Sequence, residues 1–180
     1  MPLLNSVTTP YAEALLQVVN ENDQTEQMVE EVKQLLTLIN DAPELGKTLS
    51  SPVLEKETKK KIIIEIFSEK INSSLLNFLK LLADRQRIEI VTSILDRFLE
   101  IYRENSNIAL ATVTSAVELT DEQKGLITKK IINIAGTEKL ELVTKIDPSL
   151  IGGFVASVGS KVIDASLASQ IRKLGLSLSK

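Results

Sequence analysis

The sequence predicts a mainly α-helical protein in two parts. Residues 1–105 are expected to form a six-helix bundle, and residues 106–180 a small α/β domain with a short β-sheet and a C-terminal helix. Apolar residues recur at helical spacing through the first part, whereas six of the seven glycines lie from Gly125 onward. The net charge also changes, from −5 before the boundary to +2 after it. We therefore expect a domain boundary within the sequence ENSNIA.

The first helices are delimited by caps and prolines. Thr9 suits an N-cap, and Pro10 suits the first helical position, where its missing N–H leaves no hydrogen bond unmade. Asp23 is the expected cap of the second helix. Pro43 and Pro52 bracket a short segment that we interpret as a brief third helix.

Three further helices complete the predicted bundle. The run IIIEIF favours a β-strand by composition, but the length and the charged start of its segment favour a fourth helix over residues 56–67. Asn72 or Ser73 is expected to cap a fifth helix, which has almost no polar face. The sixth helix is expected from about residue 87 to residue 102, with its apolar stripe facing inward.

The second part mixes strands with one well-marked helix. It begins with the alternating run IALATVTSAV, which is typical of a strand. Thr120 and Gln123 then form a capping-box pattern at the start of a helix that is expected to end near Gly136. Alternation in KLELVTKID predicts a second strand.

The stretch from Asp147 to Leu174 predicts a β-hairpin that leads into a helix, because two apolar runs flank a Gly-Ser turn signal and precede an amphipathic segment. Gly152 and Gly153, with Gly159, could be considered as a phosphate cradle. However, neither GxGxxG nor GxxxxGK[ST] spacing is present. The double glycine is better interpreted as a bend that lets a strand pass closely over its neighbours.

The composition removes most catalytic chemistry. The chain contains no histidine and no cysteine, so Ser-His and Cys-His pairs, thiolate nucleophiles and cysteine zinc sites are all absent. Asp84 with Glu89, or Asp147 with Asp164, could be proposed as acid–base pairs, but surface and turn roles explain them better. We expect no catalytic, cofactor-binding or metal-binding residues.

The charge pattern also argues against a nucleic-acid partner. The net charge is −3, and the only basic cluster is KETKKK, residues 56–61. We interpret this cluster as the solvated start of a helix, with a lipid or nucleic-acid patch as the alternative. No segment has the eighteen or so uncharged apolar residues of a membrane span, and the N-terminus lacks a targeting pattern. A soluble chain that starts directly on its fold is therefore expected.

Several segments together resemble the δ subunit family of F-type ATP synthases. They are YAEALLQV after a Thr-Pro, LLADRQRIEIV, VTSAVELTDEQ and, above all, IDPSLIGGFVASVGSKVIDASLASQIRKL. The resemblance covers essentially the whole chain in the right order and is similar to cyanobacterial and plastid members, with a composition that suits a plastid-encoded chain. The mitochondrial counterpart is the oligomycin-sensitivity-conferring protein.

The resemblance implies a non-catalytic connector in the peripheral stalk. The N-terminal bundle of this family holds the N-terminal helices of α subunits in a groove between its first and fifth helices. Core packing alone would also explain much of the apolar character of these two helices. The groove positions in this chain would be Tyr11, Ala14, Leu15, Val18, Leu75, Phe78, Leu79 and Leu82.

The second part would grip the C-terminal ends of b-type stalk subunits. Many relatives carry a basic residue in the strand after the double glycine, where this chain has Ala156 and Ser157. This difference puts an electrostatic contact at that point in doubt, but not the fold. The docking positions would be Gly152, Gly153, Phe154, Val158, Leu167 and Ile171.

The resemblance further implies the setting of the chain. It would act without a cofactor, would not be a homo-oligomer, and would meet a thylakoid or plasma membrane only through its complex, on the plastid stromal or bacterial cytoplasmic side. A small enzyme that relies on carboxylates, and an adaptor that binds lipid or nucleic acid through Lys56–Lys61, are the rival hypotheses.

Overall fold

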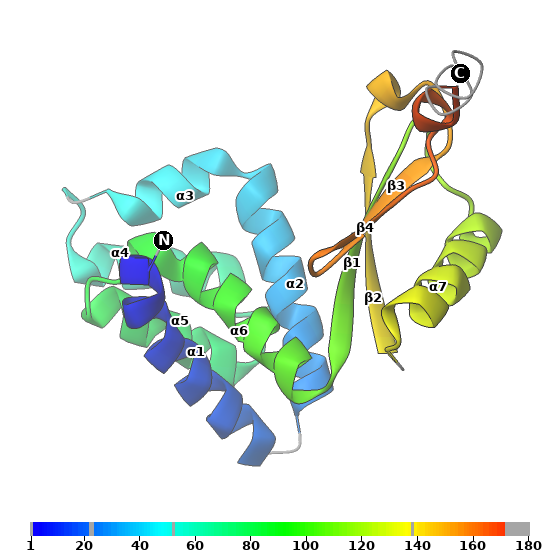
Figure 1. The fold of residues 1–180 in the computed structure, drawn as a ribbon. Helices are drawn as coiled ribbons and strands as arrows, with labels where there is room; N and C mark the ends of the chain where they lie inside the picture. Colours follow the sequence, from blue (N-terminus) through cyan, green and yellow to red (C-terminus); the bar gives the residue numbers. More distant parts are fainter. Residues whose placement is uncertain (1, 22–23, 52, 138, 172–180) are drawn as a thin grey trace. The chain divides into compact units, whose positions relative to one another are not determined.

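The protein is mainly helical and carries one small four-stranded sheet (Figure 1). The structure, a computed structural model, describes residues 2–21, 24–51, 53–137 and 139–171. The chain separates into two compact units, Met1–Tyr102 and Arg103–Lys180, which are described in turn.

The first unit is built from helices joined by short connections. Asn72 caps α5 by accepting a hydrogen bond from the backbone N–H of Ser74, as the sequence predicts. The N-cap position of α2 is Gln24, and the predicted cap Asp23 lies outside the described residues. The helices are α1 (Pro2–Glu21), α2 (Thr25–Asp41), α3 (Pro43–Ser50), α4 (Lys56–Phe67), α5 (Ser73–Asp84) and α6 (Val91–Asn105), with the 3-10 turn η1 (Ile88–Ile90) before α6.

The predicted start of the first helix is wrong. Helix α1 begins at Pro2, so that Pro10 lies inside it and Thr9 is not its cap. Tertiary contacts stabilise the additional turns. The Thr8 side chain is buried, and the Thr9 hydroxyl accepts a hydrogen bond from Arg97 Nε on α6 at 3.4 Å. A rule for proline positions that considers only the neighbouring residues does not include these contacts, because they involve a distant helix.

Helix α4 settles the ambiguity of the isoleucine run. Ile63 and Phe67 are buried, and they lie one helical turn apart on the same face. Ile64, which lies between them in sequence, is exposed. This alternation with a period near four residues fits a helix whose one face joins the core, and not a strand buried on both faces.

One hydrophobic core joins the helices of the first unit. Its side chains come from α1 to α6 and η1, and the exposed residues lie on the opposite faces of the helices. The largest fully buried side chains of this unit are Phe67, Phe98, Met28, Ile63, Leu75, Leu82, Ile94, Leu95, Val19 and Val32.

The second unit is a sheet of order β2-β1-β3-β4. Strands β1 (Ile108–Ser115) and β2 (Lys139–Ile146) are parallel and are connected through α7 (Asp121–Ala135), because a parallel pair requires a crossover. Strands β3 (Phe154–Val158) and β4 (Lys161–Asp164) form the predicted antiparallel hairpin, and β3 also pairs with β1.

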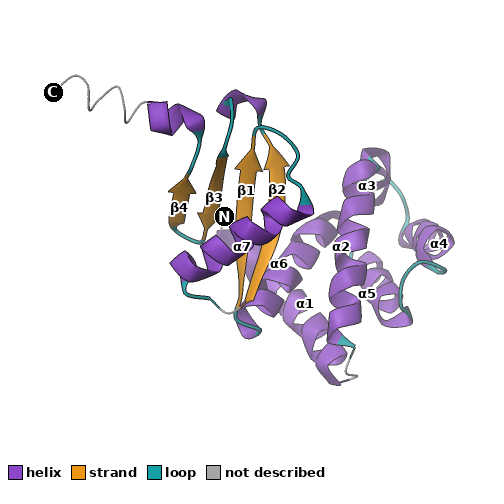
Figure 2. Ribbon diagram, turned by 90° about the vertical axis from the view of Figure 1, so that its right-hand side faces the viewer, coloured by secondary structure: helices purple, strands orange, loops and turns teal. Residues whose placement is uncertain are grey.

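Helix α7 lies across one face of the sheet (Figure 2). Alternate residues of β1 and β3 face it, since the strand period is two. Ile127 and Ile131 of the helix complete a small core with Ala111, Val113 and Ala156.

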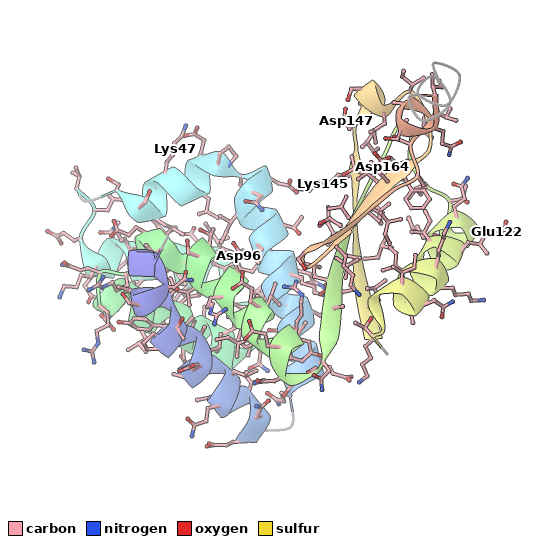
Figure 3. The ribbon with its side chains drawn as sticks, viewed as in Figure 1. Lys47, Asp96, Glu122, Lys145, Asp147 and Asp164 are labelled. Atoms are coloured by element: carbon pink, nitrogen blue, oxygen red, sulfur yellow. The ribbon has the colours of Figure 1, made fainter. Side chains whose placement is uncertain are left out.

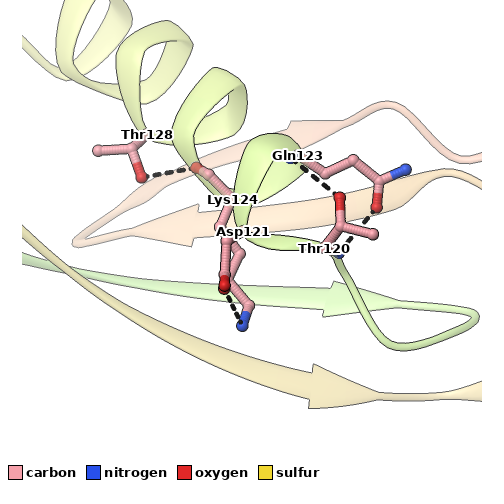
Figure 4. A network of polar contacts seen from close by, with 5 residues as sticks. All are labelled: Thr120, Asp121, Gln123, Lys124 and Thr128. Carbon is pink, nitrogen blue, oxygen red and sulfur yellow. Dashed lines mark hydrogen bonds and ion pairs between the residues drawn. The ribbon is translucent and has the colours of Figure 1, made fainter.

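The capping box at the start of α7 forms as predicted (Figure 4). Thr120 Oγ1 accepts from the backbone N–H of Gln123 at 3.3 Å, and Gln123 Oε1 accepts from the N–H of Thr120 at 3.0 Å. Gly136 ends the helix in the left-handed conformation, with φ 73°.

Candidate docking surfaces

An apolar cavity of about 440 Å³ lies at one end of α7 in the second unit. Three segments form its walls: the connection that follows β1, the part of α7 from Gln123 to Lys130, and the loop that precedes β3. Among the described residues that line the cavity, only Lys130 is charged. The lining residues are Ser115, Ala116, Val117, Leu119, Gln123, Leu126, Ile127, Lys130, Ile151, Gly152, Gly153 and Phe154.

Three large apolar side chains of this lining are strongly exposed. The exposed fractions are 70% for Val117, 63% for Leu126 and 75% for Ile151. Each comes from a different wall of the cavity. Exposed apolar groups gathered around an apolar hollow are typical of a protein-binding surface. We refer to these three residues as the rim.

The double glycine brings the last described segment against the cavity wall. Gly153 has φ 78°, and a Cβ there would overlap the carbonyl oxygen of Ala165 and lie 3.0 Å from Ser166 Cα. A Cβ at Gly152 would lie 2.7 Å from Leu167 Cδ1, and the N–H of Leu167 donates to the carbonyl of Gly152 at 3.0 Å. The glycines therefore permit a close approach, which is the structural role that the sequence favours.

The loop before the glycines is fixed by Asp147, which lies at the start of the 3-10 turn η2 (Pro148–Leu150) (Figure 3). Asp147 Oδ1 accepts from the backbone N–H of Ser149 at 3.0 Å. The hydrogen bond from the Ser149 side chain, with that from its backbone, holds the pKa of the Asp147 carboxyl below its ordinary value of 3.8. The N–H of Asp147 donates to Ser115 O at 2.8 Å, which ties this turn to the end of β1.

The cavity unites half of the positions predicted for stalk docking. Gly152, Gly153 and Phe154 line it. Val158 instead belongs to the small core under α7, so its side chain faces inward. Leu167 is exposed beside Gly152, and Ile171 is exposed near the end of the described chain.

Sequence reasoning missed the opposite side of the cavity, formed by Val117, Leu119, Leu126 and Ile127. The predicted strand IALATVTSAV includes Val117, but β1 ends at Ser115, so Val117 and Leu119 both lie in the connection to α7. Leu126 and Ile127 are adjacent apolar residues on α7, and that doubling was the available sign that the apolar face of this helix is wider than the sheet requires.

The absence of a basic residue after the double glycine has a structural counterpart. Ala156 is fully buried in the core beneath α7, where a charged side chain would lose its hydration. Ser157 lies on the other face of the sheet and is partly exposed. Of the two positions, only 157 is able to carry a charge without disturbing the core.

The eight predicted groove residues of the first unit divide by burial. The side chains that a partner would reach are Ala14 and Val18, which are exposed, and Tyr11, which is half-buried. The other five belong to the core of the unit, where they contact neighbouring helices instead of solvent. These five are Leu15, Leu75, Phe78, Leu79 and Leu82.

The basic cluster at the start of α4 is partly engaged in ion pairs. Lys60 Nζ lies 2.5 Å from Asp84 Oδ1 on α5 and 3.4 Å from Glu57 Oε1. The hydrogen bond to Asp84 raises the pKa of Lys60 above 10.5; partial burial opposes the rise, and Glu57 adds to it. The cluster therefore acts at least in part as a structural link between α4 and α5.

Three of the four carboxylates considered for acid–base chemistry have local partners in the structure. Asp84 pairs with Lys60, and Asp147 caps η2. Asp164 Oδ1 accepts hydrogen bonds from the N–H and the hydroxyl of Ser166, and Oδ2 accepts one from the Ser169 hydroxyl. Among the described residues, no three acidic side chains gather closely enough to hold a metal ion. Nor does any described helix have the length and hydropathy needed to cross a membrane.

Comparison with known protein families identifies proteins that are similar to this chain. The family model for the ATP synthase delta (OSCP) subunit matches residues 7–178. The chain belongs to this family. It is thus a non-catalytic subunit of an F-type ATP synthase.

Individual relatives agree with this membership. An ATP synthase subunit delta of Prochlorococcus marinus subsp. pastoris is 94% identical over 180 residues, and the alignment covers all of both chains. The ATP synthase subunit delta of Prochlorococcus marinus strain MIT 9303 is 56% identical and is covered over 99% of its length. The match therefore includes both units.

A solved structure shares the fold of this delta-family chain. It is a chain of the Toxoplasma gondii mitochondrial ATP synthase hexamer, which superposes with a TM-score of 0.71 at 18% identity. The superposition covers 96% of this chain and 97% of that chain. At this identity the likeness establishes the fold and not the contacts of individual residues.

Proposed function

We propose that this chain is the connector of the peripheral stalk, which joins the catalytic head of the synthase to the membrane-anchored b-type subunits. Its first unit, with α1–α6 as a six-helix bundle, would hold N-terminal helices of α subunits. Its second unit would hold the C-terminal ends of b-type subunits. The observation that carries the proposal is the apolar cavity beside α7 with the exposed rim Val117, Leu126 and Ile151.

The physical task explains why a binding protein suits this position. A rotary synthase needs its head held still against the torque of the turning rotor, so the connector needs affinity and stiffness and no reactive group. Apolar burial supplies affinity at about 25 cal/mol per Å² before the costs of association are subtracted. The chain offers such surface without a histidine or cysteine in its sequence.

The proposed docking surface of the second unit differs from the one expected from sequence. It adds Val117 and Leu126 to Gly152, Gly153 and Phe154, because these residues line one cavity. In the first unit, the proposed surface is reduced to the accessible residues Tyr11, Ala14 and Val18 of α1. The predicted residues of α5 would join it only if α5 became exposed when a partner binds.

The proposed setting follows from the relatives. They come from Prochlorococcus marinus, so we place the chain at the periphery of a thylakoid or plasma membrane on the bacterial cytoplasmic side, and not in a plastid. Contact with the membrane would be indirect, and the chain would act as one copy in the complex, without a cofactor.

The test is a binding experiment with defined partners. The full chain, carrying an affinity tag, is mixed separately with purified α subunit and with the soluble parts of the b-type subunits from Prochlorococcus marinus. We expect binding to both, with b-type binding reduced by Leu126→Asp. Absence of binding to the b-type subunits by the unmodified chain would overturn the connector role.

A further inference from the structure

Ile151 combines two unfavourable features in the free chain. Its φ is 63° and its ψ −38°, and the N–H of Gly152 donates to the carbonyl of Leu150 at 2.6 Å, so Ile151 is the central residue of a γ-turn. This turn is rare and strained with a positive central φ, and it is least suited to a β-branched residue. The same side chain is 75% exposed, although it is large and apolar.

The surrounding hydrogen bonds hold this conformation from both sides. Before the turn, the N–H of Ile151 donates to Pro148 O at 3.3 Å, and the N–H of Leu150 donates to Asp147 O at 3.2 Å. After the turn, the carbonyl of Gly152 accepts from Leu167 at 3.0 Å. The backbone thus fixes Ile151 although its own side chain gains little from the arrangement.

The strained turn lies at the apolar cavity, which indicates a role in binding. Ile151 lines the apolar cavity together with Val117 and Leu126, the other two members of the rim. A side chain that is already fixed in its exposed position loses little conformational freedom when a partner covers it, and this favours tight binding. A side chain that becomes fully covered when the partner binds contributes more to affinity than one that stays in contact with water.

We propose that Ile151 is the preorganised anchor of the second unit, and that it inserts between apolar side chains on one face of an α-helix of a b-type stalk subunit. This inference rests on the proposed connector function. Lys130 is the only charged residue among the described residues of the cavity lining, and it favours a partner helix that carries a carboxylate next to its apolar face.

The decisive variant is Ile151→Gly, because glycine accepts a positive φ while removing the side chain. We expect the full-length variant to melt at the same temperature as the unmodified chain or higher, and to bind the soluble b-type subunits at least tenfold more weakly. A residue with a merely structural role would lower the melting temperature when truncated. Ile151→Asn is the second variant, since asparagine also tolerates this conformation but is polar.

The matched control is Val53→Asn, which changes the most exposed large apolar side chain described in the first unit. We expect it to leave b-type binding unchanged. If Ile151→Gly binds like the unmodified chain while Leu126→Asp binds more weakly, the docking surface stands and the anchor assignment is wrong. If the unmodified chain does not bind, the connector function itself fails.

A further measurement separates the stalk helix from a second copy of this chain as the occupant. Sedimentation of the unmodified chain alone should show a monomer. A dimer that Ile151→Gly converts to monomer would mean that the rim binds another copy, and would overturn the assignment to a stalk subunit.

Discussion

The carbonyl oxygen of Ala165 lies directly against Gly153, so that no side chain fits at position 153. Gly153, the residue before β3, and Ala165, two residues before the last described helical segment (residues 167–171), are thereby held at backbone contact. Ala165 also donates its N–H to Phe154 O at 3.0 Å. The backbone contact at Gly153 is therefore part of the wall of the proposed docking surface.

We expect Gly153→Ala to destabilise the second unit. The left-handed φ of 78° alone costs an alanine about 1–2 kcal/mol, and displacement of the Ala165 backbone adds to this. Urea unfolding followed by circular dichroism would measure the loss. The control is Gly125→Ala, because nothing lies within 4 Å of a Cβ there and α7 should gain about 0.5–1 kcal/mol. Equal effects of the two changes would contradict the close approach.

Thr120→Ala should remove the capping box of α7. The N–H of Gln123 loses its acceptor, and the expected loss of unfolding free energy is about 1 kcal/mol. Thr128→Ala is the matched control, because Thr128 Oγ1 only donates back to Lys124 O within the helix and alanine is the better helix former. Thermal unfolding should separate the two variants, and a larger loss for Thr128→Ala would argue against the cap.

The Lys60–Asp84 pair should make the first unit sensitive to alkaline pH. Because the pKa of Lys60 is raised above 10.5 in the folded chain, the stabilisation is fully present below 10.5 and is lost as the pH rises through the folded-state value. Asp84→Asn should flatten this part of the profile of unfolding free energy against pH. Asp84 and Glu89 line one surface hollow, so Glu89→Gln removes a neighbouring carboxylate but leaves the ion pair, and it should keep the profile of the unmodified chain.

Binding of an α-subunit N-terminal helix should depend on Val18, whose side chain is 46% exposed on α1. Val18→Lys should weaken binding of a synthetic peptide about tenfold in a fluorescence titration, with little change in stability. Gln17→Lys, at the neighbouring exposed position, should bind normally. Unchanged binding by Val18→Lys would place the α-subunit site elsewhere.

Leu79→Asp does not provide a clean test of the same groove. The side chain of Leu79 is 2% exposed in the helical core, so an aspartate there would bury an unpaired charge. We expect this variant to lose about 3 kcal/mol or more of its free energy of unfolding. It should also lose peptide binding, because the unit unfolds. Circular dichroism would distinguish this outcome from loss of a contact.

Local signals in the sequence were sufficient to predict features whose hydrogen-bond partners lie within a few residues of each other. The caps at Asn72 and Thr120, the left-handed stop at Gly136 and the β3–β4 hairpin were predictable, because their partners lie within a few positions. The start of α1 was not. The Thr9 hydroxyl contacts Arg97, which is 88 positions away, and no local rule for Pro10 includes that contact.

The docking surfaces show the same limit more strongly. Helical periodicity identified apolar faces on α1 and α5, but it did not distinguish the buried Leu79 from the exposed Val18, because that depends on the neighbouring helices. The cavity of the second unit joins Val117 and Leu126 to Ile151, which lie on segments separated in the chain. Their proximity follows from the parallel pairing of β1 and β2 and from the position of α7.

The amino-acid sequence by itself determined the helical class of the first part, the strands and capped helix of the second, the absence of histidine and cysteine chemistry, and the family resemblance. These are properties of composition and of short-range hydrogen bonding. Only the tertiary structure decided which apolar side chains remain exposed and that Ile151 adopts a positive φ at the cavity rim. Burial and backbone strain are set by contacts between distant segments, and those contacts exist only after folding.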